Sequence, residues 1–252
     1  MILLENLAFQ YGKNQVLHQL SGIFPTAKLT VVLGRNGTGK STLFNIIAGL
    51  EKRYSGLVSI NGIDRRVIKL GHRRQVRIGF LTQFHQSTFP FHVFDVVLTG
   101  RSAFTRFTPR DTDRACVERI LKRFQLWHLK DRPYTELSGG ERQLVLLSRV
   151  LVQEPDVILL DEPTNHLDLH YQVTVMQNLR QLVKEGTTVI AVMHDPNLAF
   201  LYGDHFFAMH GGNLQSLDNL SVEDLKRVLE TTYRLPLSLL PHGEVSLIVP
   251  TS

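Results

Sequence analysis

The stretch Gly34 to Thr42 reads GRNGTGKST and constrains the fold of this 252-residue chain more than any other. It follows the apolar, β-branched run 29–33 and precedes an apolar segment, so we expect a strand, a glycine-rich turn and a helix in succession. The stretch fits the complete pattern G-x-x-x-x-G-K-[ST] of a phosphate-binding loop. Its glycine spacing, G-x-x-G-x-G, disfavours a dinucleotide-binding loop, which reads G-x-G-x-x-G.

The residue types of this phosphate loop suit a nucleoside triphosphate. Its three glycines permit backbone angles that turn successive N–H groups toward phosphate oxygens, and the following helix adds its dipole. Lys40 can place a charge on the outer phosphates, Ser41 can ligate magnesium, and Thr42 can hold the phosphates nearest the sugar. The alternative is a glycine turn that only joins a strand to a helix.

Composition restricts the class of protein. A hydrophobic content of 43% and a charged content of 20% are typical of a soluble globular chain. No apolar run approaches the roughly 20 residues that cross a bilayer, and the first residues lack the basic start of a signal peptide, so we expect a cytosolic protein. The single cysteine, Cys116, cannot form an internal disulfide and is expected to be a buried, inert thiol.

The chain is basic, with a net charge of +5 and a pI near 9.4. Such a balance allows anionic partners, but the charge is scattered, and we expect no nucleic-acid partner. A solvated face is the simpler interpretation of the local basic cluster, and contact with lipid headgroups is the alternative. The cluster comprises Arg65, Arg66, Lys69, His72, Arg73, Arg74 and Arg77.

Two carboxylates follow a second apolar run. Residues 157–160 are typical of a central parallel strand, and Asp161 and Glu162 come directly after them. Open α/β sheets bind ligands at the carboxyl ends of their strands, and alternation points neighbouring side chains to opposite sides. We therefore expect Asp161 to hold magnesium and Glu162 to activate the attacking water.

Polar or aromatic residues also follow three other expected strands. Gln83 follows the run 78–82, where an amide can reach magnesium, although a lone glutamine carries no inference. His194 follows the run 187–193 and can contact a terminal phosphate, the alternative being a structural histidine. Tyr11 can stack on a nucleobase or simply cap its strand.

The sequence LSGGE at Leu137 to Glu141 has two interpretations. Ser138 and Glu141 form a capping box that opens a helix. Gly139 and Gly140 are poor helix formers and leave bare N–H groups, so a phosphate-binding helix end fits equally well. The residues alone do not decide between them.

The remaining segments suggest an α/β core with an inserted part. The first third reads as antiparallel strands near 2–9, 16–24 and 57–60, whereas segment 91–136 reads as helical. Within that segment, Thr108 is expected as an N-cap, Pro109 at the first helical position and Asp111 at the third. A last helix is expected to begin at Ser221.

The ordered set GRNGTGKST, Gln83, LSGGE, VILLDEP, NHLD and His194 resembles the nucleotide-binding subunit of ABC transporters, over nearly the whole chain. The resemblance implies an α/β fold with a P-loop NTPase core, an antiparallel β subdomain and an inserted helical subdomain. Residues 1–252 would form one ATP-binding domain, with the core at 1–83 and 142–235, the helical subdomain at 84–141 and a tail at 236–252.

In this family the LSGGE of one subunit faces the phosphate loop of another, so two ATP molecules lie in a head-to-tail homodimer. The implied catalytic residues are Glu162, His194, Lys40 and Gln83, the magnesium ligands are Ser41, Gln83 and Asp161, and Asp168 couples the two sites. The implied ATP-binding residues are Tyr11, Gly34, Arg35, Asn36, Gly37, Thr38, Gly39, Lys40, Ser41 and Thr42, with Ser138, Gly139, Gly140 and Glu141 from the partner.

Three further stretches are similar to importers for iron–siderophore, haem or cobalamin compounds. They are VFDVVLTGR at 93–101, DEPTNHLDLHYQ at 161–172 and HDPNLAFLYGD at 194–204. The resemblance implies an ATP hydrolase at the cytoplasmic face of the inner membrane, attached to a polytopic permease and, through it, to a substrate-binding protein. The alternatives are a soluble ABC ATPase, such as one for iron–sulfur cluster assembly, an importer of another substrate, or a nucleotide-binding module without catalysis.

Overall fold

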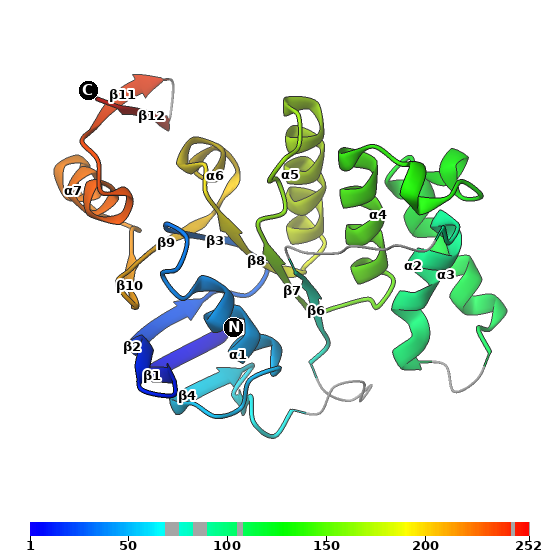
Figure 1. Ribbon diagram of the computed structural model, residues 1–252, viewed down its shortest axis with the longest axis horizontal. Coiled ribbons are helices and arrows are strands. Elements are labelled where there is room, and N and C mark those ends of the chain that lie inside the picture. The colour runs from blue at the N-terminus through cyan, green and yellow to red at the C-terminus, as the bar shows by residue number, and fades with distance from the viewer. Residues whose placement is uncertain (69–75, 83–89, 105–107, 243–244, 252) are drawn as a thin grey trace. The chain divides into compact units, whose positions relative to one another are not determined.

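The computed structural model describes residues 1–68, 76–82, 90–104, 108–242 and 245–251 (Figure 1). The chain forms two compact units. The first comprises 1–68 with 179–252, and the second comprises 69–178. The boundary between residues 178 and 179 falls within helix α5 (Leu169–Lys184).

An antiparallel sheet makes up much of the first unit, as the sequence predicts for the first third of the chain. Its strands lie in the order β2-β1-β4-β5. The inward positions of β1 are buried, which is the period-two pattern of a sheet with one covered face. The strand bounds are Ile2–Tyr11 for β1, Asn14–Phe24 for β2, Ser55–Ile60 for β4 and Ile63–Asp64 for β5.

A group of mostly parallel strands carries the phosphate loop. Strand β3 (Leu29–Leu33) pairs in parallel with β8 (Thr188–Met193) and β9 (His205–His210), and β9 pairs antiparallel with β10 (Asn213–Ser216). Every residue of β3 and β8 is buried, which explains their unbroken apolar sequence. The helices of this unit include α1 (Lys40–Ala48), α6 (Pro196–Tyr202) and α7 (Val222–Tyr233).

The segment after α7 forms a hairpin, whereas the sequence predicts only a tail at 236–252. Strands β11 (Leu237–His242) and β12 (Val245–Pro250) pair antiparallel, with Leu237 opposite Pro250 (Figure 1, orange to red). The hairpin is joined to α6 through Asn197, whose side-chain amide exchanges two hydrogen bonds with the backbone of Ile248. The tail is therefore folded against the rest of its unit.

Arg65 is buried at the end of α1, so the expectation of a solvated basic cluster is wrong for this residue. The side chain is 2% exposed. Its Nε donates to the carbonyl of Ile47 at 2.7 Å, and its Nη2 donates to that of Ala48. Gly49, at φ 79°, makes room, because a Cβ there would lie 1.9 Å from Arg65 Nη2. The guanidinium thus satisfies carbonyls that the helix leaves without partners.

Other members of the basic cluster lie elsewhere. The guanidinium of Arg66 stacks over the ring of Tyr54, 4.3 Å from its centroid, and pairs with Asp64. Arg77 precedes β6 in the second unit. Lys69, His72, Arg73 and Arg74 lie outside the described residues.

The second unit combines two parallel strands with helices. Strand β6 (Ile78–Leu81) pairs with β7 (Val157–Asp161), and Leu81 lies opposite Leu160. Between 90 and 138 the described residues are helical apart from turns and a bridge between His92 and Pro133, as predicted. The helices are α2 (Val93–Leu98), α3 (Asp111–Arg123), α4 (Gly139–Leu151) and the start of α5 (Leu169–Lys184), with short helices at Thr99–Phe104, Trp127–Leu129 and Tyr134–Glu136.

The predicted start of α3 is wrong. The helix begins at Asp111, and Arg110, rather than Thr108, occupies the N-cap position with an extended backbone. The carboxylate of Asp113 accepts a hydrogen bond from the Arg110 N–H at 3.0 Å, which satisfies a donor at the helix entrance. Pro109 therefore precedes the helix instead of occupying its first position.

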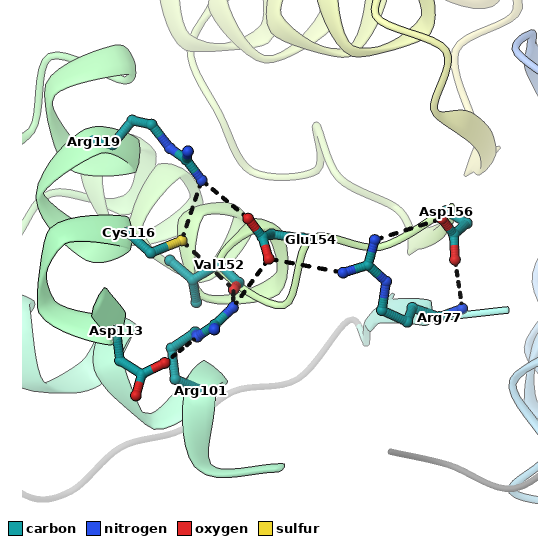
Figure 2. Close-up of polar contacts among 8 residues, drawn as sticks. All are labelled: Arg77, Arg101, Asp113, Cys116, Arg119, Val152, Glu154 and Asp156. Carbon is teal, nitrogen blue, oxygen red and sulfur yellow. Dashed lines mark hydrogen bonds and ion pairs between the residues drawn. The ribbon is translucent and has the colours of Figure 1, made fainter. Parts of the chain in front are cut away.

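A buried ion pair joins α3 to the segment after α2 (Figure 2). Arg101 Nε lies 2.8 Å from Asp113 Oδ1, and the two side chains are 10% and 3% exposed. Arg101 also donates to the carbonyl of Val152 at 2.7 Å. Burial alone would raise the pKa of Asp113, but the Arg110 N–H and the Arg101 guanidinium outweigh burial and lower it below its ordinary value.

Glu154 extends this network toward β6. Its carboxylate lies within 4 Å of three guanidinium groups, those of Arg77, Arg101 and Arg119 (Figure 2). Cys116 is buried beside them, as expected, with its Sγ 3.5 Å from a nitrogen of Arg119. Since Glu154 and Arg119 are about half exposed or more, we expect the buried pair of Arg101 and Asp113 to dominate the energetics.

Replacing Asp113 by Asn should destabilise the fold by roughly 3 kcal/mol at pH 7, because it removes the nearest carboxylate from the buried Arg101 guanidinium and leaves the half-exposed Glu154 carboxylate, 3.4 Å away, as a weaker counter-charge. The folded-state pKa of Asp113 is lowered, so the wild-type advantage is complete above the unfolded pKa of about 3.9 and declines as the pH falls through the folded value. Urea unfolding of both proteins from pH 7 to pH 3 measures this difference.

The matched control is Glu118→Gln on the same helix, which removes one partner of the largely exposed pair with Lys122. Its effect should stay within about 0.5 kcal/mol. Equal destabilisation by the two substitutions would show that the pair of Arg101 and Asp113 has no special weight.

Candidate functional site

The phosphate loop lies between the end of β3 and the start of α1. Gly37 and Gly39 have φ values of 80° and 101°, which side chains of L-residues disfavour. A Cβ on Gly39 would also lie 2.8 Å from Leu17 Cδ2, so the Leu17 side chain would have to shift to admit one. The loop leads into the N-terminus of α1, where backbone N–H groups and the helix dipole favour an anion.

Lys40 places its ammonium inside this loop. Nζ donates to the carbonyl of Gly34 at 2.7 Å and to that of Arg35 at 2.8 Å, and the residue is 5% exposed. A buried cation held by neutral carbonyls in its own loop is well suited to an incoming phosphate, which forms stronger, charge-assisted hydrogen bonds.

A cavity of about 550 Å³ lies against residues 35–38 of the loop. Its lining also comes from the start of β2, the turn between β9 and β10, and the last turn of α7. The lining includes Arg35, Arg234, His18 and His210 and no acidic residue among those described. The volume is that of an ordinary ligand pocket, and the side chains favour an anionic occupant. Sequence reasoning missed Thr231, Thr232 and Arg234 in this lining, because no motif marks them.

His194 lies at the same edge of the parallel strands as the loop. Leu33 and Met193 are opposite each other in the pairing of β3 with β8, so Gly34 and His194 are the next residues on neighbouring strands. Asp195 then caps α6, and its carboxylate accepts from the N–H groups of Asn197 and Leu198. The backbone carbonyl of His194 accepts a hydrogen bond from the hydroxyl of Tyr233 at 3.2 Å.

Tyr11 ends β1 and is 53% exposed. Its ring packs edge-on against Phe9, with the centroids 4.7 Å apart. Together with Arg53 it lines a separate cavity of about 330 Å³, and it is not part of the lining of the larger cavity beside the loop. The exposure of the ring leaves area for a flat partner to stack on.

In the second unit, Asp161 and Glu162 lie at the carboxyl end of β7. They are 7% and 9% exposed, which is unusual for carboxylates. Glu162 has φ 56°, a left-handed conformation that is rare for this residue type, and Asn165 donates a hydrogen bond to its carboxylate. Gln83 was expected beside them, and it lies outside the described residues.

The LSGGE segment opens α4 with the predicted capping box. Ser138 Oγ accepts from the Glu141 N–H at 3.3 Å, and the Glu141 carboxylate accepts from the Ser138 N–H at 2.8 Å. The hydrogen bond from the Ser138 N–H lowers the pKa of the Glu141 carboxyl below its ordinary value. Ser138 and Gly139 are exposed, so the cap leaves this helix end accessible to a second molecule.

Asp168 lies near this helix end. Its carboxylate accepts from the N–H of Tyr171 at 3.0 Å, and a Cβ on Gly140 would lie 2.1 Å from the ring of Tyr171. Gly140 must therefore be a glycine, because the ring of Tyr171 leaves no space for a Cβ there. The second unit thus brings together the LSGGE segment and Asp168, and the first brings together the phosphate loop and His194.

Among the described residues, no helix combines the length and apolar character that a membrane span requires.

Comparison with known proteins identifies relatives along most of the chain. The sequence model of the ABC transporter family matches residues 17–165. The hemin import ATP-binding protein HmuV of Rhodococcus jostii is 34% identical over 94% of this chain and 81% of its own length. The petrobactin import ATP-binding protein YclP of Bacillus subtilis is 32% identical over 85% of each chain. The sulfate/thiosulfate import ATP-binding protein CysA of Escherichia coli is 36% identical over 84% of this chain and 58% of its own length.

Solved structures agree with these relatives. A metal-chelate type ABC transporter in an inward-facing conformation matches with a TM-score of 0.85 and 30% identity, over 100% of this chain and 97% of that one. The ATP-binding cassette MJ0796, a dimer bound to ADP and phosphate, matches with a TM-score of 0.73 and 27% identity, over 87% of this chain and 100% of that one. These matches confirm the predicted α/β fold class. Because both the family model and relatives above 30% identity cover most of the chain, it belongs to the ABC transporter family as an ATP-binding domain, and it is an ATPase.

Proposed function

We propose that this ATPase powers an importer for a metal chelate of the iron–siderophore, haem or cobalamin kind. The observation that carries its ATPase chemistry is the Lys40 ammonium, held inside a glycine loop at the start of α1. The importer assignment is supported by the hemin and petrobactin import relatives and by the metal-chelate transporter structure. The sulfate import relative supports a second candidate, an importer of another substrate.

The phosphate loop binds the triphosphate, and Tyr11 stacks on the adenine. Gly34 to Thr42 surround the phosphates, and Lys40 neutralises charge that develops during transfer. Ser41, Asp161 and Gln83 offer hydroxyl, carboxylate and amide oxygens, a set that suits Mg²⁺. When bound, magnesium supplies charge neutralisation at the phosphates.

Glu162 acts as the general base, and His194 contacts the terminal phosphate. The Glu162 carboxylate is buried and oriented by Asn165, and its backbone adopts a conformation that is costly for a non-glycine residue. Such strain is a feature of functional sites, where surrounding structure enforces it. Orientation matters because the base must accept a proton from a water at a defined position.

The second half of each ATP site comes from a partner subunit. Ser138 and Gly139 are exposed at the N-terminus of α4, where N–H groups and the helix dipole suit the phosphates of ATP on the partner. Gly140 and Glu141 keep this helix end in shape, and Asp168 couples the two sites. The dimeric state of the related cassette MJ0796 supports this arrangement.

The complete assembly is a homodimer at the cytoplasmic face of the inner membrane, attached to a polytopic permease that receives cargo from a substrate-binding protein. The whole chain, 1–252, is one ATP-binding domain. Its core comprises 1–83 and 142–235, its helical subdomain 84–141, and its tail 236–252. Closure of the dimer on ATP moves the helical subdomains, and the permease receives this motion.

Replacing Glu162 by Gln should preserve ATP binding and reduce turnover by at least about a hundredfold, because the amide keeps the shape of the side chain and cannot accept the proton. Nucleotide binding and phosphate release measured on the same preparation test this. Glu223→Gln, an exposed change at the start of α7, is the control and should leave both unchanged. Normal hydrolysis by the Glu162 variant would disprove the general-base assignment.

Shared sites predict complementation between two inactive variants. Lys40→Ala and Ser138→Arg homodimers should each lose hydrolysis at both sites. In a mixed dimer of these variants both defects fall on one site, so the other site is intact and roughly half of the wild-type activity should return. Differently tagged subunits and tandem purification provide the mixed dimer. An inactive mixed dimer would mean that each site lies within a single subunit.

Purification of the tagged chain from detergent-solubilised membranes should retain a polytopic membrane protein. In liposomes, the ATPase activity of that complex should increase several-fold with a cognate binding protein loaded with haem, a ferric siderophore or cobalamin. Sulfate-loaded binding protein serves as the comparison, and stimulation by sulfate alone would favour the second candidate. Recovery of only soluble proteins would contradict the importer assignment.

A further inference from the structure

The four residues that follow strand β8, 194–197, are held by the C-terminal part of the chain. The hydroxyl of Tyr233, the last residue of α7, donates to the His194 carbonyl at 3.2 Å. Asn197 Nδ2 donates to the Ile248 carbonyl at 3.1 Å, and the Ile248 N–H donates to Asn197 Oδ1 at 2.7 Å. These partners are 39 and 51 residues away along the sequence, so they are genuine tertiary constraints.

The hydrogen bond from the Tyr233 hydroxyl to the His194 carbonyl is expected to persist at neutral pH. Burial, and next the nearby negative charge of Asp195, raise the pKa of the Tyr233 phenol above its ordinary value. The hydroxyl therefore stays protonated and remains a donor across the neutral range. Asp195 is itself fixed, because its carboxylate accepts from the Asn197 N–H at 2.8 Å and the Leu198 N–H at 3.2 Å.

The same turn of α7 also faces the phosphate loop. Thr231, Thr232 and Arg234 line the 550 Å³ cavity together with residues 35–38 of the loop. The end of α7 therefore lies beside the phosphate loop and also bonds to the residue that follows β8. The hydrogen bond from Tyr233 therefore couples the position of His194 to that of the phosphate loop.

We propose that Tyr233 is a positioning residue for His194, and that α7 with the β11–β12 hairpin fixes residues 194–197 in the geometry that hydrolysis requires. This inference rests on the catalytic role of His194 in the proposed function. Pairing with β3 constrains the backbone as far as Met193, so His194 is the first residue beyond the ladder. A small displacement of a catalytic group is costly in rate, because reacting atoms must meet within narrow limits of distance and angle.

The first test is Tyr233→Phe, which removes only the hydroxyl. ATP affinity and KM should stay within about twofold, and kcat should fall about fivefold to tenfold, the effect of one lost hydrogen bond on the transition state. The matched control is Tyr202→Phe at the end of α6, whose hydroxyl makes no hydrogen bond within the described residues. It should leave kcat and KM unchanged. An unchanged kcat for Tyr233→Phe, or a proportional rise in KM, would overturn the inference.

A double-mutant cycle separates positioning from a general loss of stability. In a His194→Ala background, Tyr233→Phe should cause less than a twofold further change, because the group that it positions is gone. An equal fractional loss in both backgrounds would overturn the inference. If His194→Ala alone hydrolyses ATP at the normal rate, the proposed role of His194 fails, which is a distinct result.

NMR provides a readout that does not require turnover by the His194 variant. In the dimer with a non-hydrolysable ATP analogue, Tyr233→Phe should shift or broaden the ring resonance of His194, assigned by comparison with His194→Ala. Tyr202→Phe should leave that resonance in place. A His194 resonance that is identical in wild type and Tyr233→Phe would overturn the inference.

Discussion

Helix α1 is held in place at both ends, by the phosphate loop and by Arg65. The position of the loop that binds the phosphates depends on this helix. Its first turn follows the phosphate loop, and its last carbonyls accept hydrogen bonds from the buried guanidinium of Arg65. A cation at the C-terminus of a helix complements the dipole, whose opposite end favours an anion at the loop. Arg65 comes from the segment after β5, so the antiparallel strands and the phosphate loop are connected through one side chain. A loop that binds phosphate with backbone N–H groups needs such a rigid support, since small displacements would misdirect several donors together.

Much of the candidate site was predictable because its signals are local. A buried parallel strand reads as an apolar run, and a polar residue directly after it lies at the sheet edge, which is how Asp161, Glu162 and His194 were found. The capping box at Ser138 was equally visible, because both partners lie within one turn. The attachment of the β11–β12 hairpin to Asn197 and the contact of Tyr233 with His194 were missed, since the partners lie dozens of residues apart along the chain. The burial of Arg65 was not predicted, because the basic residues near it in the sequence indicate a solvent-exposed segment. Its burial is decided instead by the carbonyls of α1 and the open space at Gly49.

The strands organise the chemistry into two groups. In the first unit, the pairing of β3 with β8 places the phosphate loop and His194 on neighbouring strand ends. In the second, β7 carries the carboxylates, and α4 presents the LSGGE segment beside Asp168 and Tyr171. The phosphate loop and the two carboxylates after β7 thus belong to separate compact units.

Three buried cations illustrate how similar chemistry serves different purposes. Arg101 is paired with a carboxylate and a carbonyl, so its charge is neutralised within the fold. Arg65 donates to carbonyls at the C-terminus of α1. These carbonyls cannot move away from the guanidinium unless the last turn of α1 unwinds. Lys40 is held by the carbonyls of Gly34 and Arg35, which belong to its own short loop. Phosphate oxygens can replace those carbonyls, because a charge-assisted hydrogen bond is stronger than one to a neutral acceptor. Lys40 therefore differs from Arg65 in that these two of its contacts are to carbonyls that an anion can replace.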